Sequence, residues 1–111
     1  MAIDFVHLHV HSVFSLLDGA CPVAELPRRA KELGQQSLAI TDHGVMYGCI
    51  DFYKACKAEG VHPIIGCDVY VAPRSRFDKT AELDGEAYHL VLLCQNQKGY
   101  ENLIYLVSQG F

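Results

Sequence analysis

The sequence predicts an α/β fold, and three observations indicate this class. Apolar segments and segments of helical periodicity follow one another in the order strand, helix, strand, helix, strand, strand, helix. Gly34 and Gly60 come directly after the first two helical segments, where glycine often ends a helix. Half of the 111 residues are hydrophobic and a fifth are charged, so a packed core is expected. This order favours a largely parallel sheet or barrel with right-handed crossovers.

The first half of the chain contains two predicted strands and two predicted helices. Residues 5–10 are expected to form a strand, because apolar and histidine side chains alternate there. A helix is expected to begin near Ala24, which leaves Pro27 in the tolerant first turn. Its apolar positions are Val23, Leu26, Ala30 and Leu33. Residues 37–41 are typical of a strand buried on both faces. The second helix is expected at 47–59, with an inward face of Cys49, Phe52, Tyr53 and Cys56.

The second half is expected to contain a hairpin and a last helix. Strands are predicted at residues 64–71 and 88–94, with the polar residues 73–87 between them. This polar stretch holds no convincing helix and is barely long enough for a parallel crossover. The two strands are therefore predicted to pair antiparallel. The last helix is expected from about Gly99, with one face made of Tyr100, Leu103, Ile104 and Val107.

Composition and charge exclude several classes of protein. The formal net charge is −4 and no basic patch is present, so DNA would have to be held through metals or other parts of the protein. The five cysteines form no CxxC pair and are odd in number, which argues against a zinc ribbon or a closed disulfide framework. Free, mostly buried thiols in a reducing compartment are expected. The chain starts without a basic segment and has no membrane-length apolar run, so a cytoplasmic protein with no membrane contact is predicted.

Three histidines alternate along the first predicted strand: His7, His9 and His11. Their spacing of two places them on one face, where neighbouring imidazoles can bind one cation. His7 lies deepest and is interpreted as a hydrogen-bonded core histidine, although a ligand is the alternative. His9 and His11 lie at the carboxyl end of the strand, where α/β folds place their chemistry.

Other candidate ligands follow the later strands. His43 comes after the strand 37–41, and Asp68 follows the apolar pair Ile64–Ile65. Asp18 lies in the loop after the first strand, where an ordinary turn aspartate is the alternative. The predicted hairpin brings His89 beside Asp68, whereas His62 is expected to be a solvated surface residue. Mixed imidazole and carboxylate ligands suit zinc, manganese or iron, and several on one rim can hold two or three metals for attack on phosphorus.

Six segments together resemble a known family. They are 6–19 (VHLHVHSVFSLLDG), 39–44 (AITDHG), 52–54 (FYK), 62–70 (HPIIGCDVY), 88–93 (YHLVLL) and 99–104 (GYENLI). The chain is similar over nearly its whole length to the start of the PHP (polymerase and histidinol phosphatase) domain in the alpha subunits of bacterial DNA polymerase III. By this resemblance, residues 1–111 are the N-terminal part of the domain, and the rest of it lies beyond Phe111.

The resemblance implies a fold and a site. The family domain is a distorted (βα)₇ barrel with up to three metals at its carboxyl rim, so this chain is expected to form an incomplete barrel. The implied ligands are His9, His11, Asp18, His43, Asp68 and His89. Asp68 departs from the glutamate common at its position, and its shorter carboxylate is expected to loosen one metal. No catalytic residue is assigned.

The resemblance also implies a function. The parent protein is expected to be a cytoplasmic, magnesium-dependent DNA polymerase that contacts DNA and other replicative subunits. Its PHP domain is expected to be a metal-dependent 3′–5′ exonuclease or a structural relic of one. Alternatives are a stand-alone phosphatase of the histidinol-phosphate type, an error-prone polymerase paralogue and a purely partner-binding module. The isolated fragment is expected to be inactive and to self-associate through its exposed sheet edge and apolar face.

Overall fold

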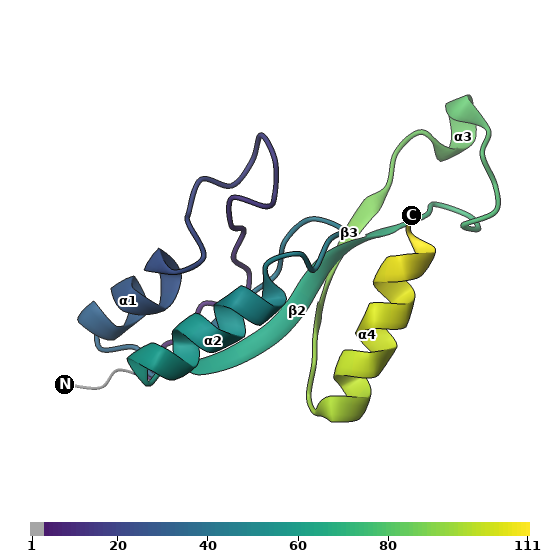
Figure 1. Cartoon of the computed structure of the whole chain (residues 1–111). Coiled ribbons are helices and arrows are strands. Elements are labelled where there is room, and N and C mark those ends of the chain that lie inside the picture. Colours follow the sequence, from purple (N-terminus) through teal and green to yellow (C-terminus); the bar gives the residue numbers. More distant parts are fainter. Residues whose placement is uncertain (1–3) are drawn as a thin grey trace.

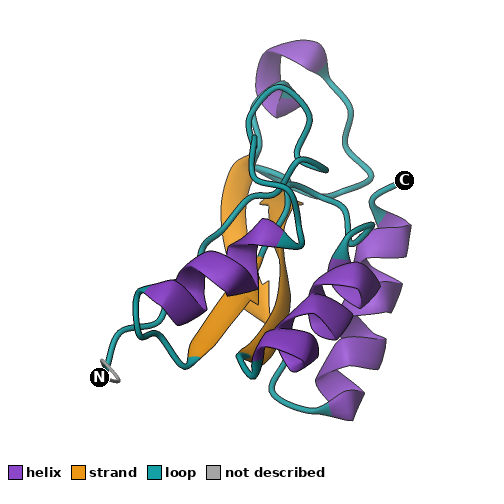
Figure 2. Cartoon of the chain, turned by 60° about the vertical axis from the view of Figure 1, so that its left-hand side comes forward, coloured by secondary structure: helices purple, strands orange, loops and turns teal. Residues whose placement is uncertain are grey.

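The computed structural model describes residues 4–111 as a three-stranded sheet with its longer helices packed on one side (Figures 1 and 2). The strand order is β1-β2-β3, with β1 parallel to β2 and β3 antiparallel to β2. The strands are β1 (Ser37–Ile40), β2 (His62–Val71) and β3 (Tyr88–Leu93). The helices are α1 (Glu25–Glu32), α2 (Cys49–Glu59), α3 (Ala81–Asp84) and α4 (Gln97–Gln109).

The helices begin and end where the local sequence permits. Pro27 is buried in the first turn of α1, where its missing N–H breaks no intrahelical hydrogen bond. Gly34 and Gly60 follow α1 and α2 with φ of 77° and 73°, a left-handed conformation that glycine adopts without steric cost. The side chain of Asn96 caps α4 by accepting a hydrogen bond from the Gly99 N–H at 2.9 Å. The last helix therefore begins two residues earlier than predicted.

The sheet confirms the predicted hairpin. β2 and β3 pair from Gly66 with Leu93 to Val71 with Tyr88, and the polar stretch between them contains only the one-turn helix α3. Leu38, Ala39 and Ile40 of β1 are buried and Ser37 is half-buried, as expected of a strand whose side chains are buried on both faces.

Two apolar clusters lie on the same side of β2. One joins α1 and α2 to β1 around Phe52, Ile40 and Cys56, and the other joins α4 to β2 and β3 around Cys67, Leu103 and Val107. Side chains alternate along a strand, so α2 and α4 cover one face of the sheet, while Asp68 points to the other. The prediction that Tyr53 faces inward is wrong, because Tyr53 is 47% exposed.

The first predicted strand is also wrong. Residues 5–10 run beside β1 without forming a strand. The Ala39 N–H donates to the His7 carbonyl at 3.1 Å and the Thr41 N–H to the Val10 carbonyl at 2.8 Å. These bonds are three residues apart on one segment and two on the other, so a regular ladder cannot continue. The Val10 N–H instead donates to the Thr41 hydroxyl at 2.8 Å.

Candidate metal centre

Five chain segments bring six side chains together at one end of the sheet. They are His9 and His11 of the N-terminal segment, Asp18 of the following loop, His43 three residues after β1, Asp68 of β2 and His89 of β3. These are the six residues that the sequence singled out as ligands.

The sheet register places His43 and His89 on either side of Asp68. The Asp68 N–H donates to the Asp42 carbonyl and the Gly44 N–H donates to the Asp68 carbonyl, both at 2.9 Å. The parallel register of β1 and β2 thus continues three residues past Ile40, the end of β1, with His43 opposite Asp68. In the hairpin, His89 pairs with Tyr70. Because side chains alternate along strands, His89 and Asp68 share one face of the sheet.

Asp68 lies at the centre of the group, with a side chain that is only 1% exposed. Its Oδ2 is 2.9 Å from His9 Nε2 and 3.2 Å from His11 Nε2. Its Oδ1 is 3.1 Å from His89 Nδ1. Such separations suit hydrogen bonds, and they also suit two ligands of one cation, whose atoms lie about 3 to 3.5 Å apart when each is about 2 Å from the ion.

Asp18 supplies a second carboxylate to the group of ligands. Its Oδ2 contacts His43 Nε2 and lies 3.4 Å from His11 Nδ1. A turn aims this carboxylate, because the N–H groups of Asp18 and Gly19 both donate to the Ser15 carbonyl, at 3.1 and 2.8 Å. Leu17 within the turn has a φ of 67°, a strained conformation for a residue with a side chain.

The six side chains form three overlapping groups. In each, one ligand atom per residue lies within 4.8 Å of the others: His9, His11 and Asp68; His11, Asp18 and His43; and His43, Asp68 and His89. His11, His43 and Asp68 each belong to two groups. The rings of His11 and His43 are close, with centroids 3.8 Å apart.

The electrostatics fit a bound cation. Burial alone would raise the pKa of the Asp68 carboxyl, but the surrounding imidazoles outweigh burial and hold that pKa below its ordinary value. The contributing side chains, in order of their effect, are His9, His89, His11 and His43. The Nδ1 atom of His43 is buried without a hydrogen-bond partner among the described residues, although Asp68 Oδ2 is 3.5 Å away. A neutral imidazole carries only one N–H, so neither His11 nor His43 can donate to both carboxylates.

Asp42 is not one of the candidate ligands, but its hydrogen bonds hold the loops that carry them. This role was not predicted from the sequence. Its buried carboxylate accepts hydrogen bonds from the Ser12 N–H at 2.5 Å, the Ser12 hydroxyl at 2.7 Å and the Ser15 hydroxyl at 2.7 Å. The Ser15 hydroxyl in turn accepts the His43 N–H at 3.1 Å. The signal in the sequence was a carboxylate directly before His43, at a strand's carboxyl end.

A hollow of about 640 Å³ opens beside these ligands. Its polar lining includes Asp18, His43 and His89. Its remaining wall is largely apolar, and comprises Phe14, Leu16, Val45, Tyr47 and Tyr70, with Ser15 between them.

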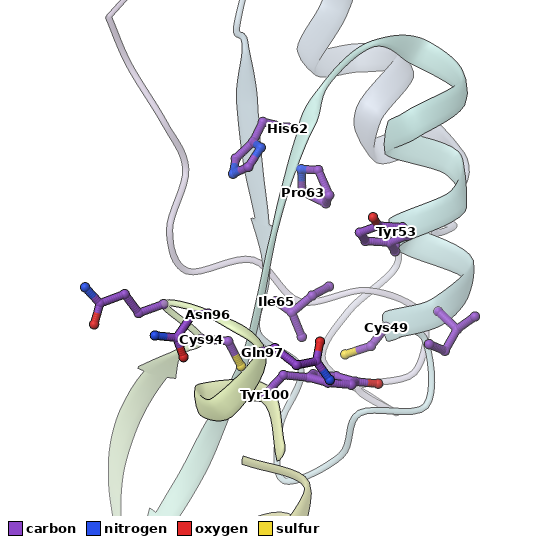
Figure 3. A pocket seen from close by; sticks show the side chains of 11 residues that line it. Cys49, Tyr53, His62, Pro63, Ile65, Cys94, Asn96, Gln97 and Tyr100 are labelled. Carbon is purple, nitrogen blue, oxygen red and sulfur yellow. The ribbon is translucent and has the colours of Figure 1, made fainter. Parts of the chain in front are cut away.

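The two other histidines lie outside the centre. His7 is exposed and packs edge-on against Phe5 with ring centroids 4.7 Å apart, so its interpretation as a core histidine is wrong. His62 is exposed, as expected. It lines a separate hollow of about 430 Å³ between α2 and the start of α4 (Figure 3). That hollow contains Cys49 and Cys94 but none of the six candidate ligands.

Comparisons with known proteins give a family match and individual relatives. The family model described as the PHP domain matches residues 7–111. A DNA polymerase III subunit alpha from Treponema pallidum is 54% identical over 109 residues, which are 97% of this chain and 9% of that protein. The subunit of the same description from Aquifex aeolicus is 48% identical over 117 residues, covering 100% of this chain and 10% of that protein. The chain thus spans about a tenth of the length of these curated relatives.

Two solved structures share the fold. One, from Bifidobacterium adolescentis, is assigned as a metal-dependent phosphoesterase, with a TM-score of 0.64 and 20% identity. The other is an amidohydrolase from Chromobacterium violaceum with bound sulfate, with a TM-score of 0.61 and 25% identity. Each match covers 90% of this chain and 32% of the other chain. The predicted α/β class is confirmed, and the chain corresponds to the part of a barrel that was expected.

Proposed function

The chain belongs to the PHP domain family, whose model matches residues 7–111, and on that basis we propose that it forms part of a metal-dependent phosphoesterase site. The observation that carries the proposal is the set of three overlapping ligand groups around Asp68. The proposed ligands are His9, His11, Asp18, His43, Asp68 and His89.

The donor set suits a divalent transition metal. Four imidazoles and two carboxylates match the preferences of zinc, manganese and iron. The Nδ1 atom of His43, which has no hydrogen-bond partner among the described residues, can donate its lone pair to a bound cation. A divalent ion held here supplies Lewis-acid chemistry for the hydrolysis of a phosphoester.

The residues of the chain have distinct tasks in this proposal. Asp68 neutralises positive charge from within the sheet, and its two oxygens face different imidazoles. Asp42 has no direct contact with the hollow and orients the loops that carry Asp18 and His43 through its serine partners. The rigid hydrogen bonding of Asp68 to the end of β1 keeps the ligands in place before any substrate enters.

The proposed parent is the alpha subunit of a bacterial DNA polymerase III, a magnesium-dependent DNA polymerase in the cytoplasm. Support comes from relatives of that description that are 54% and 48% identical over nearly the whole chain. DNA and other replicative subunits are the proposed partners. Free thiols buried in the core agree with a reducing compartment.

The proposed substrate is the mispaired 3′ end of a DNA strand, removed by 3′–5′ hydrolysis. The proposal can be tested with the full-length protein and a labelled mispaired primer, without nucleotides and with or without chelator. Digestion is expected in the presence of manganese or zinc and should fall by at least about 100-fold in His11→Ala and His43→Ala. Polymerase activity should persist, because synthesis uses a different site.

His62→Ala is the matched control, since it removes an exposed histidine outside the three groups. It should retain both the bound metal and the digestion. Metal content measured by mass spectrometry on the same samples provides a readout that does not depend on activity. A metal-loaded wild type that leaves the primer intact, or equal digestion by all variants, would instead make the domain a scaffold.

A further inference from the structure

The wall of the hollow beside the candidate ligands is aromatic and exposed. Tyr47 is 63% exposed, although it lies only two residues before α2. Its ring packs edge-on against Phe14, with centroids 6.4 Å apart and an interplanar angle of 77°. Both rings line the same hollow as Asp18, His43 and His89. Tyr47 therefore lies where its ring can meet a molecule that enters the hollow.

From this wall we infer a base-binding subsite, in which the terminal base of a single DNA strand stacks on Tyr47 while its phosphodiester lies at the candidate metal centre. The inference rests on the proposed function, because it assigns the substrate class of that same site. Aromatic side chains bind bases by stacking with little sequence preference, since every base has a π-face.

The charges of the hollow favour stacking as the source of affinity. None of the described residues that line it is lysine or arginine, and Arg76 and Lys79 line only an adjoining hollow that shares His43, Val45 and Tyr70 with it. A DNA strand can then gain affinity from cations at the ligand groups and from the rings. A small phosphate ester without a ring gains only the first, so the wall selects a nucleotide over such an ester.

Tyr47 is better suited to this role than Tyr70. The Tyr70 ring is engaged with candidate ligands, because it stacks on His43 at 6.3 Å and lies 4.9 Å from the His89 ring. Phe14, in turn, is held in place behind Tyr47. A Cβ atom at Gly48 would come within 2.8 Å of the Phe14 ring, so the glycine allows this ring to pack directly on the backbone at the start of α2. The Phe111 ring also lies near Tyr47, with centroids 6.3 Å apart and an interplanar angle of 34°. A base stacked on Tyr47 is thus bordered by the rings of Phe14 and Phe111.

Binding of a labelled single-stranded oligonucleotide to the full-length protein with manganese tests this inference. A phosphorothioate at the terminal linkage slows hydrolysis, and fluorescence anisotropy reports the Kd. Tyr47→Ala should weaken binding by about 10-fold or more, whereas Tyr47→Phe should bind like the wild type, because stacking needs the ring and not the hydroxyl. Tyr105→Ala is the matched control: Tyr105 is equally exposed at 63% but lies on α4, outside the lining of the hollow.

An oligonucleotide whose 3′-terminal nucleotide lacks its base completes the design. The wild type should bind it about 10-fold more weakly than the intact strand, and Tyr47→Ala should bind both strands alike. Equal binding of the two strands by the wild type would overturn the inference, even if Tyr47→Ala failed to fold. The metal content of the same samples distinguishes failure of the base-binding subsite from failure of the proposed function. A wild type that holds no metal would refute the metal site directly.

Discussion

Asp42 shows how a single buried residue can organise a site that it does not enter. Its carboxylate accepts three hydrogen bonds from Ser12 and Ser15, and its side chain is almost fully enclosed. A buried carboxylate is stable only when its oxygens are satisfied, so the serine-bearing loop and the end of β1 are bound to one another. Asp18 lies three residues after Ser15 in the same loop, which holds its carboxylate near His43.

Replacement of Asp42 tests this positioning role. Asp42→Ala should lower the free energy of unfolding by about 2 to 4 kcal/mol, because it leaves the buried hydroxyl groups of the two serines without a hydrogen-bond acceptor. It should also weaken metal binding by about 10- to 100-fold, as expected when groups that orient ligands are lost. Chemical denaturation and metal titration measure the two effects. Asp51→Ala, which removes an exposed aspartate from α2, should change stability by less than about 1 kcal/mol and leave metal affinity intact. Equal losses in both variants would contradict the role.

The cysteines allow a second prediction at this scale. Burial raises the pKa of the Cys49 thiol to about 12 and those of Cys56 and Cys67 to about 11. A raised pKa keeps a thiol protonated, so at pH 8 these three carry almost no reactive thiolate. Cys21 is exposed and Cys94 is half-buried.

In the folded protein at pH 8, a disulfide reagent should therefore modify Cys21 first and Cys94 more slowly. The other three should react only on unfolding, or as the pH rises toward 11. Cys21→Ser should abolish the fast phase of modification. The number of thiols that react in denaturant should fall by one. A fast phase that survives in Cys21→Ser would show that the core opens readily.

The resemblance to the PHP family implied all six candidate ligands, and positions at strand ends also indicated His9, His11, His43 and Asp68. The sequence did not predict the role of Asp42 or the exposure of His7. The motifs that carry the ligands are local to each segment. The role of Asp42 depends on which loop packs against it, and Ser12 and Ser15 are about thirty residues away in the chain. His7 was assigned to the core because it was placed in a strand, and that strand does not form.

At the scale of elements, the hairpin depends on a close contact at Gly66. A Cβ atom there would lie 2.5 Å from the Leu92 carbonyl oxygen and 2.8 Å from a methyl of Leu93. No side chain fits between β2 and β3 at this point. The glycine therefore fixes the register that brings His89 beside Asp68, two residues further along β2.

Gly66→Ala should destabilise the domain by about 1 to 3 kcal/mol, because backbone atoms must move to admit the methyl group. Gly60→Ala is the matched control. Nothing lies within 4 Å of a Cβ there, and the cost, about 1 kcal/mol, comes only from the left-handed backbone. Thermal unfolding of the two variants measures the difference. If Gly66→Ala were as stable as the wild type, the strands would be able to separate without loss.

Most elements could be predicted because each carries its own signal. Apolar periodicity and the glycines after α1 and α2 set those helices, and the polar stretch of 73–87 indicated a hairpin. The first segment has an equally clear alternation, but strand formation requires matching hydrogen bonds on a neighbour. The hydrogen bonds from this segment to residues 39 and 41 are not evenly spaced along the two segments, so no regular strand pairing forms. No property of residues 5–10 alone reveals this mismatch.

At the scale of the whole molecule, the described residues form a sheet with helices on one face only. The other face bears Asp68 together with the partly exposed Ile64 and Val91 and the exposed Leu93. Among residues 4–111, β3 pairs with β2 alone, so its outer edge carries free N–H and carbonyl groups. Within the same range, no helix is both long and apolar enough to cross a membrane.

An open apolar face and a free strand edge favour association, so we expect the isolated 111-residue chain to form dimers or larger species at micromolar concentration. Sedimentation velocity measures this directly. Leu93→Glu places a charge on the open face and should shift the population toward monomer. Leu83→Glu, at a 61% exposed position in α3, is the matched control and should not. A wild type that sediments as a monomer would refute the expectation.

The sharing of His11, His43 and Asp68 between ligand groups makes metal uptake a problem of linked equilibria. A neutral imidazole offers one lone pair, so His11 and His43 can each serve one ion at a time. An ion in the group of His11, Asp18 and His43 therefore competes with ions in both other groups. The two outer groups share only Asp68, whose separate oxygens permit joint occupancy. Uptake by these six side chains should be antagonistic, with two strongly held ions rather than three and a binding isotherm broader than that of independent sites.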